Sequence, residues 1–308
     1  MSYPNLACVV VTYNRLDKLK KTLETYEAQT VPFNSLIIVD NHSTDGTHEF
    51  LLNWKNATSH YKRFVLTMEE NKGGSGGFYE GEKFALSLNS DWIHVADDDA
   101  YPKPNMVKCF YDFISTHGHL QLAAVCSTVL YPNGERCLYH RSRIAFSITR
   151  DFNIVPVAAE EYGKEFFPIT LFSYVGTFLN ARSLNHVGLV NPDYFIYADD
   201  SEHSLRLRHD GNIVCVPALQ IIHDSCSDNN DNGVALSWKD YYFMRNNLHM
   251  IKKHYPLSLP RTILGKYIST CKGSMPPQKV LFWTAVKDAL RGKLGLHPLY
   301  KPGYEIRK

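Results

Sequence analysis

The sequence predicts an α/β fold with a mixed, mostly parallel sheet flanked by helices. Short apolar runs rich in β-branched residues alternate with segments of helical periodicity through the first hundred residues, which is the pattern of consecutive βα units. The runs are continuously apolar, as in strands that are covered on both faces. Each run ends in a polar cluster, and open α/β sheets bind ligands at the carboxyl ends of their strands. We therefore expect one crevice lined by these clusters.

The first elements form a βαβ start. A strand is expected at Leu6–Thr12, followed by a helix whose apolar residues recur over Leu16–Tyr26. A second strand at Ser35–Asp40 ends in the polar run Asn41–Gly46, and a short helix begins at Thr47. Continuous apolar strands separated by helical periodicity are typical of parallel pairing.

The alternation continues with a third strand at Phe64–Thr67, a helix at Gly76–Leu88 and a fourth strand at Asp91–Ala96. The fourth strand leads directly into the triplet Asp97–Asp99. Further along, Leu219–Ile222 is expected to form another strand. The pattern therefore predicts that several strands carry polar side chains to the same edge of the sheet.

Composition limits the classes of function. A net charge of +2 over 308 residues is too small to indicate nucleic acid as a partner. The seven cysteines are scattered without a CxxC pair, which indicates a reducing compartment and no zinc site. No segment approaches the roughly 18 apolar residues that span a bilayer. We expect a cytoplasmic protein, either soluble or peripheral on the inner face of the cell membrane.

One glycine-rich loop is present, at Lys72–Gly77. It has neither the spacing of a Walker A motif nor that of GxGxxG after the first strand. An ATPase and a dinucleotide dehydrogenase are therefore not supported, and a flexible turn without a ligand is the alternative to a binding loop.

The triplet Asp97–Asp99 places three carboxylates where the backbone leaves the fourth strand. Adjacent negative charges repel unless a cation is present. A hard divalent cation with oxygen ligands would supply that charge and bridge a diphosphate. The alternative interpretation is an acidic, solvated turn.

A second acidic pair, Asp199 and Asp200, stands where a helix is expected to begin. One carboxylate can cap the helix while the other faces the crevice, where it could act as a general base. His223 ends the later strand, and in the context of an acidic site an imidazole is a suitable further metal ligand. Both features also have purely structural interpretations, as a helix cap and a buried histidine.

Several motifs occur together in one order: VVVTYNR at Val9–Arg15, Val39–Asn41, Asn71–Gly74, the Asp97–Asp99 triplet, Tyr197–Glu202 and His223. Between about Ala7 and His249 the sequence resembles glycosyltransferase family 2. Within that family, Gly73–Phe78, Tyr174–Phe178, Asp199–His203 and Tyr241–Asn246 are most similar to bacterial galactofuranosyltransferases. Rhamnosyltransferases share many of these features.

The resemblance implies the GT-A fold and a role for each matching residue. Residues 1–255 would form the catalytic domain, with a nucleotide-sugar half at 1–100 and an acceptor and catalytic-base half at 101–255, and residues 256–308 a basic helical extension. Asp200 would be the base, with Asp199 beside it, and Asp99 and His223 would bind Mn²⁺ or Mg²⁺. Donor-binding residues would be Thr12, Asn14, Arg15, Asp40, Lys72, Gly73, Asp97 and Asp98. Acceptor-binding residues would be Tyr174, Gly176, Glu202 and Arg245.

The implied activity is inverting, metal-dependent transfer of galactofuranose from UDP-galactofuranose to a bacterial surface polysaccharide or lipid-linked glycan. A base on the acceptor side and a metal on the leaving-group side suit a single displacement. A rhamnosyltransferase using dTDP-rhamnose is the alternative within the family. A nucleotidyltransferase and a non-catalytic sugar-binding module are the alternatives from other classes.

The carboxyl-terminal segment differs in charge from the rest of the chain. Residues 261–308 contain ten Lys or Arg against two acidic residues, a charge of +8 that leaves −6 for residues 1–260. Val280–Leu290 has helical periodicity, with Phe282, Val286, Ala289 and Leu290 on one face and Trp283 near its edge. The helix could pack on the catalytic domain or on a second subunit. Alternatively, Phe282 and Trp283 could enter a membrane surface while basic residues meet anionic head groups.

Overall fold

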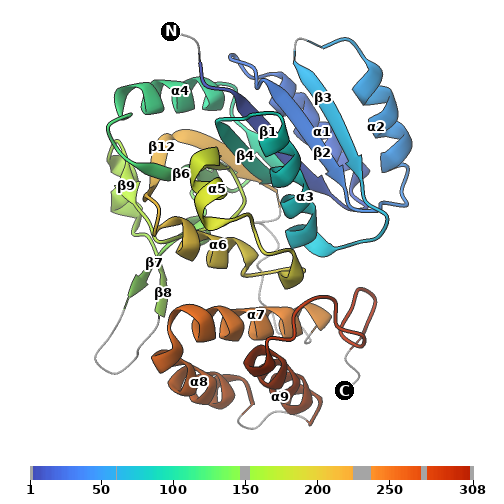
Figure 1. The fold of residues 1–308 in the computed structure, drawn as a ribbon, viewed down its shortest axis with the longest axis vertical. Helices are drawn as coiled ribbons and strands as arrows, with labels where there is room; N and C mark the ends of the chain where they lie inside the picture. The colour runs from blue at the N-terminus through green and yellow to red at the C-terminus, as the bar shows by residue number, and fades with distance from the viewer. Residues whose placement is uncertain (1–2, 60, 146–152, 225–236, 272–275, 306–308) are drawn as a thin grey trace.

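A computed structural model describes residues 3–59, 61–145, 153–224, 237–271 and 276–305 of the chain. Within these residues a nine-stranded sheet has the order β3-β2-β1-β4-β11-β6-β12-β5, with β9 paired to β12, and a second, three-stranded sheet has the order β10-β7-β8 (Figure 1). The strands are β1 (Leu6–Thr12), β2 (Ser35–Asp40), β3 (Lys62–Thr67), β4 (Trp92–Asp97), β5 (Ala100–Pro102), β6 (Leu122–Leu130), β7 (Arg141–Ala145), β8 (Asn153–Pro156), β9 (Phe167–Pro168), β10 (Leu171–Phe172), β11 (Thr177–Asn180) and β12 (Asn212–His223).

The predicted fold class is confirmed. Strands β1, β2, β3 and β4 are parallel, β11 runs antiparallel between β4 and β6, and β12 is parallel to β6. The helices are α1 (Leu16–Glu27), α2 (Thr47–Asn56), α3 (Gly73–Ser87), α4 (Met106–Thr116), α5 (Ala181–Val187), α6 (Asp199–Leu207), α7 (Trp238–His254), α8 (Leu259–Cys271) and α9 (Pro276–Arg291). Separate hydrophobic clusters lie on the two faces of the large sheet, so its central strands are buried on both sides.

Helix α3 begins three residues earlier than the periodicity predicts, because the glycine-rich loop is its first turn. A Cβ atom on Gly77 would lie 2.5 Å from Val11 Cγ1, far inside van der Waals contact. Glycine at this position therefore lets α3 pack directly on β1.

Strand register brings the polar clusters to one edge. Thr12 pairs with Asp40 of β2, while Val11 pairs with Asp97 of β4. At the other end of the strand order, β12 pairs with β5, and His223 lies opposite Ala100. Ala100 directly follows the acidic triplet in the chain. The predicted convergence of strand ends follows from this register.

Helices α7, α8 and α9 form a separate layer below the sheet (Figure 1). They share one hydrophobic cluster, to which Phe195 and Leu205 also belong. The domain boundary expected between residues 255 and 256 falls inside this layer. Helix α7 precedes the boundary, α8 and α9 follow it, and α7 packs on α9. Residues 261–308 contain ten basic residues, of which three lie outside the described residues: Lys272, Arg307 and Lys308.

Two expectations about α9 are wrong. Phe282 is fully buried in the cluster shared with α7, so it cannot enter a membrane surface. Leu290 is 45% exposed rather than on the packed face, whereas Leu281 is buried. The side of α9 that carries Phe282 therefore packs within the protein, in the cluster shared with α7. Among the helices described, none is long and apolar enough to cross a bilayer.

Candidate functional site

A cavity of about 330 Å³ lies at the carboxyl ends of β1, β2 and β4. Strand ends, the glycine-rich turn, the segment before α6 and the first turn of α7 all contribute to it. Its lining residues are Val11, Thr12, Tyr13, Arg15, Asn41, Asn71, Gly73, Gly74, Asp97, Asp98, Phe195, Ile196, Trp238, Lys239 and Pro302. Five predicted donor residues are among them, namely Thr12, Arg15, Gly73, Asp97 and Asp98.

The other three predicted donor residues, Asn14, Asp40 and Lys72, do not line this cavity. Asn14 Oδ1 accepts a hydrogen bond from the Thr44 backbone N–H at 2.7 Å. Asp40 is fully buried, and its Oδ1 accepts from the Ser43 N–H at 2.9 Å. Its second oxygen, Oδ2, is buried without a hydrogen-bond partner among the described residues. Because a buried carboxylate oxygen is costly to leave unpaired, Asp40 is suited to accept a hydrogen bond from a ligand.

Asparagine side chains hold the glycine-rich turn in place. Asn41 Nδ2 donates to the Gly73 carbonyl at 2.9 Å and to Asn71 Oδ1 at 3.0 Å. Asn41 Oδ1 accepts from the Lys72 backbone N–H at 3.1 Å. Lys72 is thus engaged through its backbone. These bonds couple the end of β2 to the start of α3.

Gly73 is the point where this turn meets the segment before α6. Its φ is +72°, and a Cβ atom there would lie 2.0 Å from the Phe195 carbonyl oxygen. That same oxygen accepts a hydrogen bond from the Ser75 N–H at 3.2 Å. Only glycine combines the left-handed backbone with this approach.

Asp98 points back toward β1 and α1. Thr12 Oγ1 donates to its Oδ2 at 2.7 Å, and Arg15 Nη1 lies 3.3 Å from its Oδ1 and 2.8 Å from Asp99 Oδ2. Thr22 Oγ1 donates to the Asp98 carbonyl. Burial raises the pKa of Asp98 to about 6, although the Arg15 charge opposes the shift. Asp98 therefore anchors the acidic turn.

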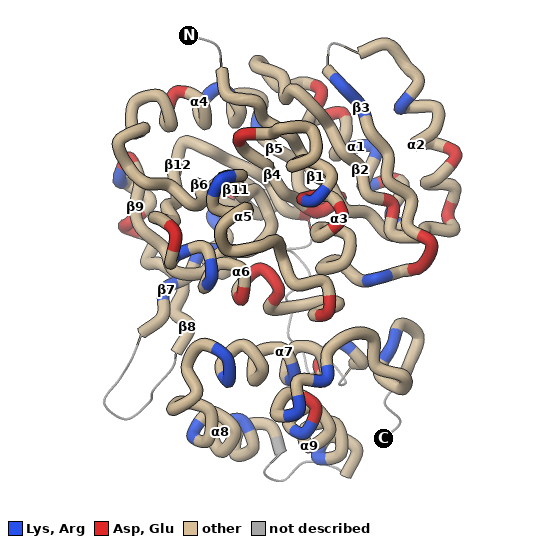
Figure 2. Tube along the Cα trace, in the orientation of Figure 1, with Lys and Arg blue, Asp and Glu red and all other residues tan. Residues whose placement is uncertain are grey.

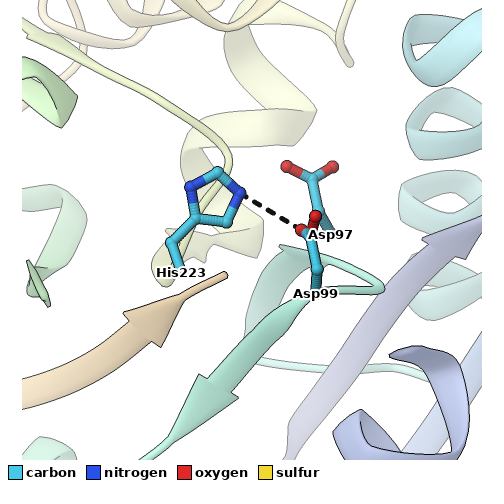
Figure 3. Close-up of side chains that lie close together, drawn as sticks. All are labelled: Asp97, Asp99 and His223. Atoms are coloured by element: carbon cyan, nitrogen blue, oxygen red, sulfur yellow. Dashed lines mark ion pairs between the residues drawn. The ribbon is translucent and has the colours of Figure 1, made fainter. Parts of the chain in front are cut away.

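Asp97, Asp99 and His223 converge on one point (Figure 3). One ligand atom from each lies within 4.8 Å of the others. His223 Nε2 is 3.1 Å from Asp99 Oδ1, and Lys18 Nζ is 3.6 Å from Asp99 Oδ2. Two carboxylates and an imidazole form a donor set that suits Mn²⁺ or Mg²⁺, so these residues fit the predicted ion.

The electrostatics of this group favour a cation. Burial and then the Asp99 charge raise the pKa of Asp97. Burial lowers the pKa of His223, but the hydrogen bond with Asp99 and the two carboxylate charges outweigh it, so the pKa is raised overall. A divalent ion would remove the repulsion between the carboxylates.

Asp199 and Asp200 begin α6, as predicted. Ala198, which precedes them, has a φ of +61°. Asp199 is buried, whereas Asp200 is half-buried and its Oδ1 accepts from the Ser201 N–H at 2.6 Å. Burial and then the Asp199 charge raise the pKa of Asp200. The Asp97 charge also raises the pKa of Asp200, so Asp200 and the acidic turn interact electrostatically.

Two predicted acceptor residues lie in the interior instead of at the cavity. The Tyr174 hydroxyl donates to Glu82 Oε1 at 2.7 Å and also contacts His203 Nδ1. Gly176 has a φ of +71°, and a Cβ there would be 2.8 Å from Ile221 Cγ2. Both positions are therefore fixed by packing in the core.

The other two predicted acceptor residues connect α6 and the segment before it to α7. Glu202 is fully buried and pairs with Arg206 at 2.9 Å and Lys253 at 2.7 Å. Arg245 is 1% exposed, and its Nη2 donates to the Tyr194 carbonyl at 3.2 Å. All four predicted acceptor residues are buried and none lines the cavity described above, so their contact with an acceptor stays a prediction.

A buried arginine that the sequence did not single out, Arg141, begins β7 and follows His140 in the chain. Arg141 Nε donates to the Ser127 carbonyl at 2.9 Å and its Nη2 to the Val175 carbonyl at 2.6 Å. The neighbouring His140 places its ring edge-on to that of His223, with centroids 5.1 Å apart. Arg141 therefore ties β6 to the segment before β11, and His140 beside it contacts the ring of His223.

Comparison with known proteins agrees with this geometry. The model of the family described as "Glycosyl transferase family 2" matches residues 7–187, more than half of the chain. The chain belongs to glycosyltransferase family 2. It is 31% identical over 216 residues to galactofuranosyltransferase GlfT1 of Mycobacterium tuberculosis, an alignment that covers 66% of this chain and 64% of that relative's length.

Solved structures show the same GT-A fold. GalNAc-T7 with UDP, GalNAc and Mn²⁺ superimposes with a TM-score of 0.64 at 14% identity, covering 94% of this chain and 55% of that one. Staphylococcus aureus TarS 1-349 in complex with UDP-GlcNAc gives 0.59 at 15% identity, covering 93% and 81%. At these identities the likeness concerns the fold alone.

Sequence reasoning missed several residues of this family 2 site. Asp97, a predicted donor contact, lines the cavity and also lies with Asp99 and His223. Trp238, Lys239 and Pro302 line the cavity although none of them belongs to a quoted motif. No local pattern predicts that the chain after α9 returns to the cavity.

Proposed function

We propose that this chain transfers a sugar from a nucleoside-diphosphate donor to a glycan acceptor, with inversion at the anomeric carbon and with Mn²⁺ or Mg²⁺ bound. The observation that carries the proposal is the grouping of Asp97, Asp99 and His223 at a cavity that also has Thr12 and Gly73 in its walls. Family membership and the UDP-containing structures of the same fold support the donor class.

The nucleotide would enter between the ends of β1 and β2. Asp40, which ends β2 directly before the cavity residue Asn41, is the proposed partner of the base or ribose. Arg15 and Lys239 in the cavity wall would supply positive charge near the phosphates. Asp97, Asp99 and His223 would hold the divalent ion, which when bound neutralises the charge of the departing diphosphate.

Asp200 would act as the general base. Its carboxylate accepts a proton from the attacking acceptor hydroxyl, which then displaces the nucleoside diphosphate in line. Asp199 beside it raises the basicity of Asp200 and, being buried, is less suited to contact an acceptor. A single displacement inverts the anomeric configuration.

UDP-galactofuranose is the proposed donor and galactofuranose the sugar transferred. A bacterial surface polysaccharide or lipid-linked glycan is the proposed acceptor. The 31% identity with a galactofuranosyltransferase supports this choice. A panel of nucleotide sugars containing UDP-galactofuranose and dTDP-rhamnose, with nucleoside diphosphate release as the readout, tests it. Turnover of dTDP-rhamnose alone would refute the donor assignment, and release of pyrophosphate from a sugar phosphate and a nucleoside triphosphate would refute the class.

The base assignment has its own test within the same assay. Asp200→Asn should lower the transfer rate by roughly 10²- to 10⁴-fold while donor affinity stays nearly constant. Asp199→Asn is the matched change at the adjacent carboxylate. A severe loss with Asp199→Asn and a mild one with Asp200→Asn would reverse the assignment.

A further inference from the structure

Helices α8 and α9, which lie in the layer below the sheet (Figure 1), and the turn before α8 carry large apolar side chains in contact with solvent. Six of them are between 45% and 94% exposed: Leu257, Leu264, Ile268, Val280, Trp283 and Leu290. We call these six residues the outer stripe. Six exposed apolar side chains on one layer indicate a surface that binds a protein or a membrane.

The spacing of these residues places them on one side of each helix. Leu264 and Ile268 are four apart on α8, whereas Leu257 lies in the 3-10 turn Pro256–Ser258 that precedes this helix. On α9 the exposed positions Val280 and Trp283 are three apart. Residues three, four and seven apart share a helix face.

The two helices are joined along this surface by an aromatic contact. The rings of Tyr267 on α8 and Trp283 on α9 have centroids 5.7 Å apart. The buried side of α9, which includes Phe282, packs into the cluster shared with α7. The exposed apolar side chains of α8 and α9 are therefore separate from the side chains of these helices that form the buried cluster.

Basic residues accompany the outer stripe. Lys287, Arg291 and Lys293 are exposed at the carboxyl-terminal end of α9 and just after it, and Figure 2 shows that Lys and Arg predominate on this layer. The sequences of α8 and α9 contain one acidic residue, Asp288. It is buried and accepts a hydrogen bond from the Tyr241 hydroxyl at 2.8 Å, so it does not offset the surface charge.

We propose that the outer stripe docks on an anionic lipid bilayer surface. Apolar side chains would enter the interfacial region, where tryptophan is favoured, while Lys287, Arg291 and Lys293 meet anionic head groups. A second copy of the chain is a poorer occupant, because a two-fold contact through this surface would place like charges together. The inference goes beyond the proposed function and does not depend on it.

Vesicle sedimentation of the full chain, without donor or acceptor, tests the proposal. We expect binding to phosphatidylcholine vesicles that contain phosphatidylglycerol, weaker binding in high salt, and little binding to phosphatidylcholine alone. Replacing Lys287, Arg291 and Lys293 together by Gln should lower the partition coefficient on the order of 100-fold, since each charge contributes roughly fivefold. Lys55→Gln on α2 is the matched control and should bind like the wild type.

A second variant tests the apolar part. Leu264→Ser combined with Ile268→Ser should weaken binding in low and high salt alike, whereas Leu52→Ser, at a residue 46% exposed on α2, should not. Thermal melts check that each variant is folded. Failure of the wild-type chain to sediment with anionic vesicles, or equal binding by all variants, would overturn the proposal. So would a dimer in analytical ultracentrifugation that the Leu264 and Ile268 changes dissociate.

Discussion

Replacing Gly73 by Ala should damage both stability and catalysis, because this glycine joins the donor half of the site to the segment before the base. At φ +72° an alanine is strained, at a cost of about 1–3 kcal/mol. Its Cβ would also lie 2.0 Å from the Phe195 oxygen and 2.6 Å from the Phe195 carbonyl carbon. These are backbone atoms, which cannot rotate away.

Relief of this contact requires the Phe195 backbone or the glycine-rich turn to move by about 1 Å or more. Overpacking of this kind typically costs about 1–3 kcal/mol. The two contributions together predict a loss of about 2–6 kcal/mol in the free energy of unfolding. The movement would also misplace Asp200, five residues after Phe195, so the transfer rate should fall by more than tenfold even in the fraction of protein that remains folded.

Urea denaturation and steady-state kinetics of Gly73→Ala measure the two effects. Gly74→Ala is the matched control, because a Cβ on Gly74 meets no atom within 4 Å and the residue lies in the first turn of α3. The control should be as stable as the wild type or slightly more stable. Equal stability of the two variants, with equal rates, would refute the steric argument and the coupling between the two loops.

Three further results are expected. Burial and the Asp199 charge raise the pKa of Asp200 to about 7. Because a general base must be deprotonated, the rate of sugar transfer should rise as the pH passes through this value. A rate that is flat from acid to neutral pH would exclude Asp200 as the base. Lys239→Met should raise KM for the donor about fivefold, the value of a partly exposed charge pair, while Lys55→Met on α2 should not. Burial raises the pKa of Glu82 from 4.5 to about 7, so the folded state retains a proton that the unfolded state loses as the pH rises above 4.5. Stability should therefore fall by up to about 3 kcal/mol between these values, and Glu82→Gln should flatten this profile in urea denaturation series.

The strands were predictable because their apolar runs are continuous and end abruptly in polar residues. Leu6–Thr12 and Ser35–Asp40 have the predicted bounds. Parallel pairing then dictates that their ends meet at one edge, which is why the cavity was predicted in outline. The start of α3 was missed since glycines have low helix propensity, and here packing against β1 outweighs it.

Burial limited the prediction of individual site residues. Motif similarity identifies Tyr174, Glu202 and Arg245 but does not say which way their side chains point, and all three are buried in hydrogen-bonded networks. The helical layer was hard to predict for a related reason. The periodicity of α9 indicates that one face packs, whereas its partner α7 is known only from the tertiary structure.

Divalent-cation-dependent binding of UDP is the most direct measurement of the central claim, because it needs neither the donor sugar nor the acceptor to be known. Isothermal titration with UDP should show clear binding in Mn²⁺ and a large loss of affinity in chelator. His223→Ala should weaken the Mn²⁺-dependent part by about tenfold or more, the effect expected when a metal site loses support, while His48→Ala on α2 leaves it unchanged. Equal UDP affinity in Mn²⁺ and in chelator, or no binding in either, would contradict the assignment of Asp97, Asp99 and His223 as a metal-assisted nucleotide site.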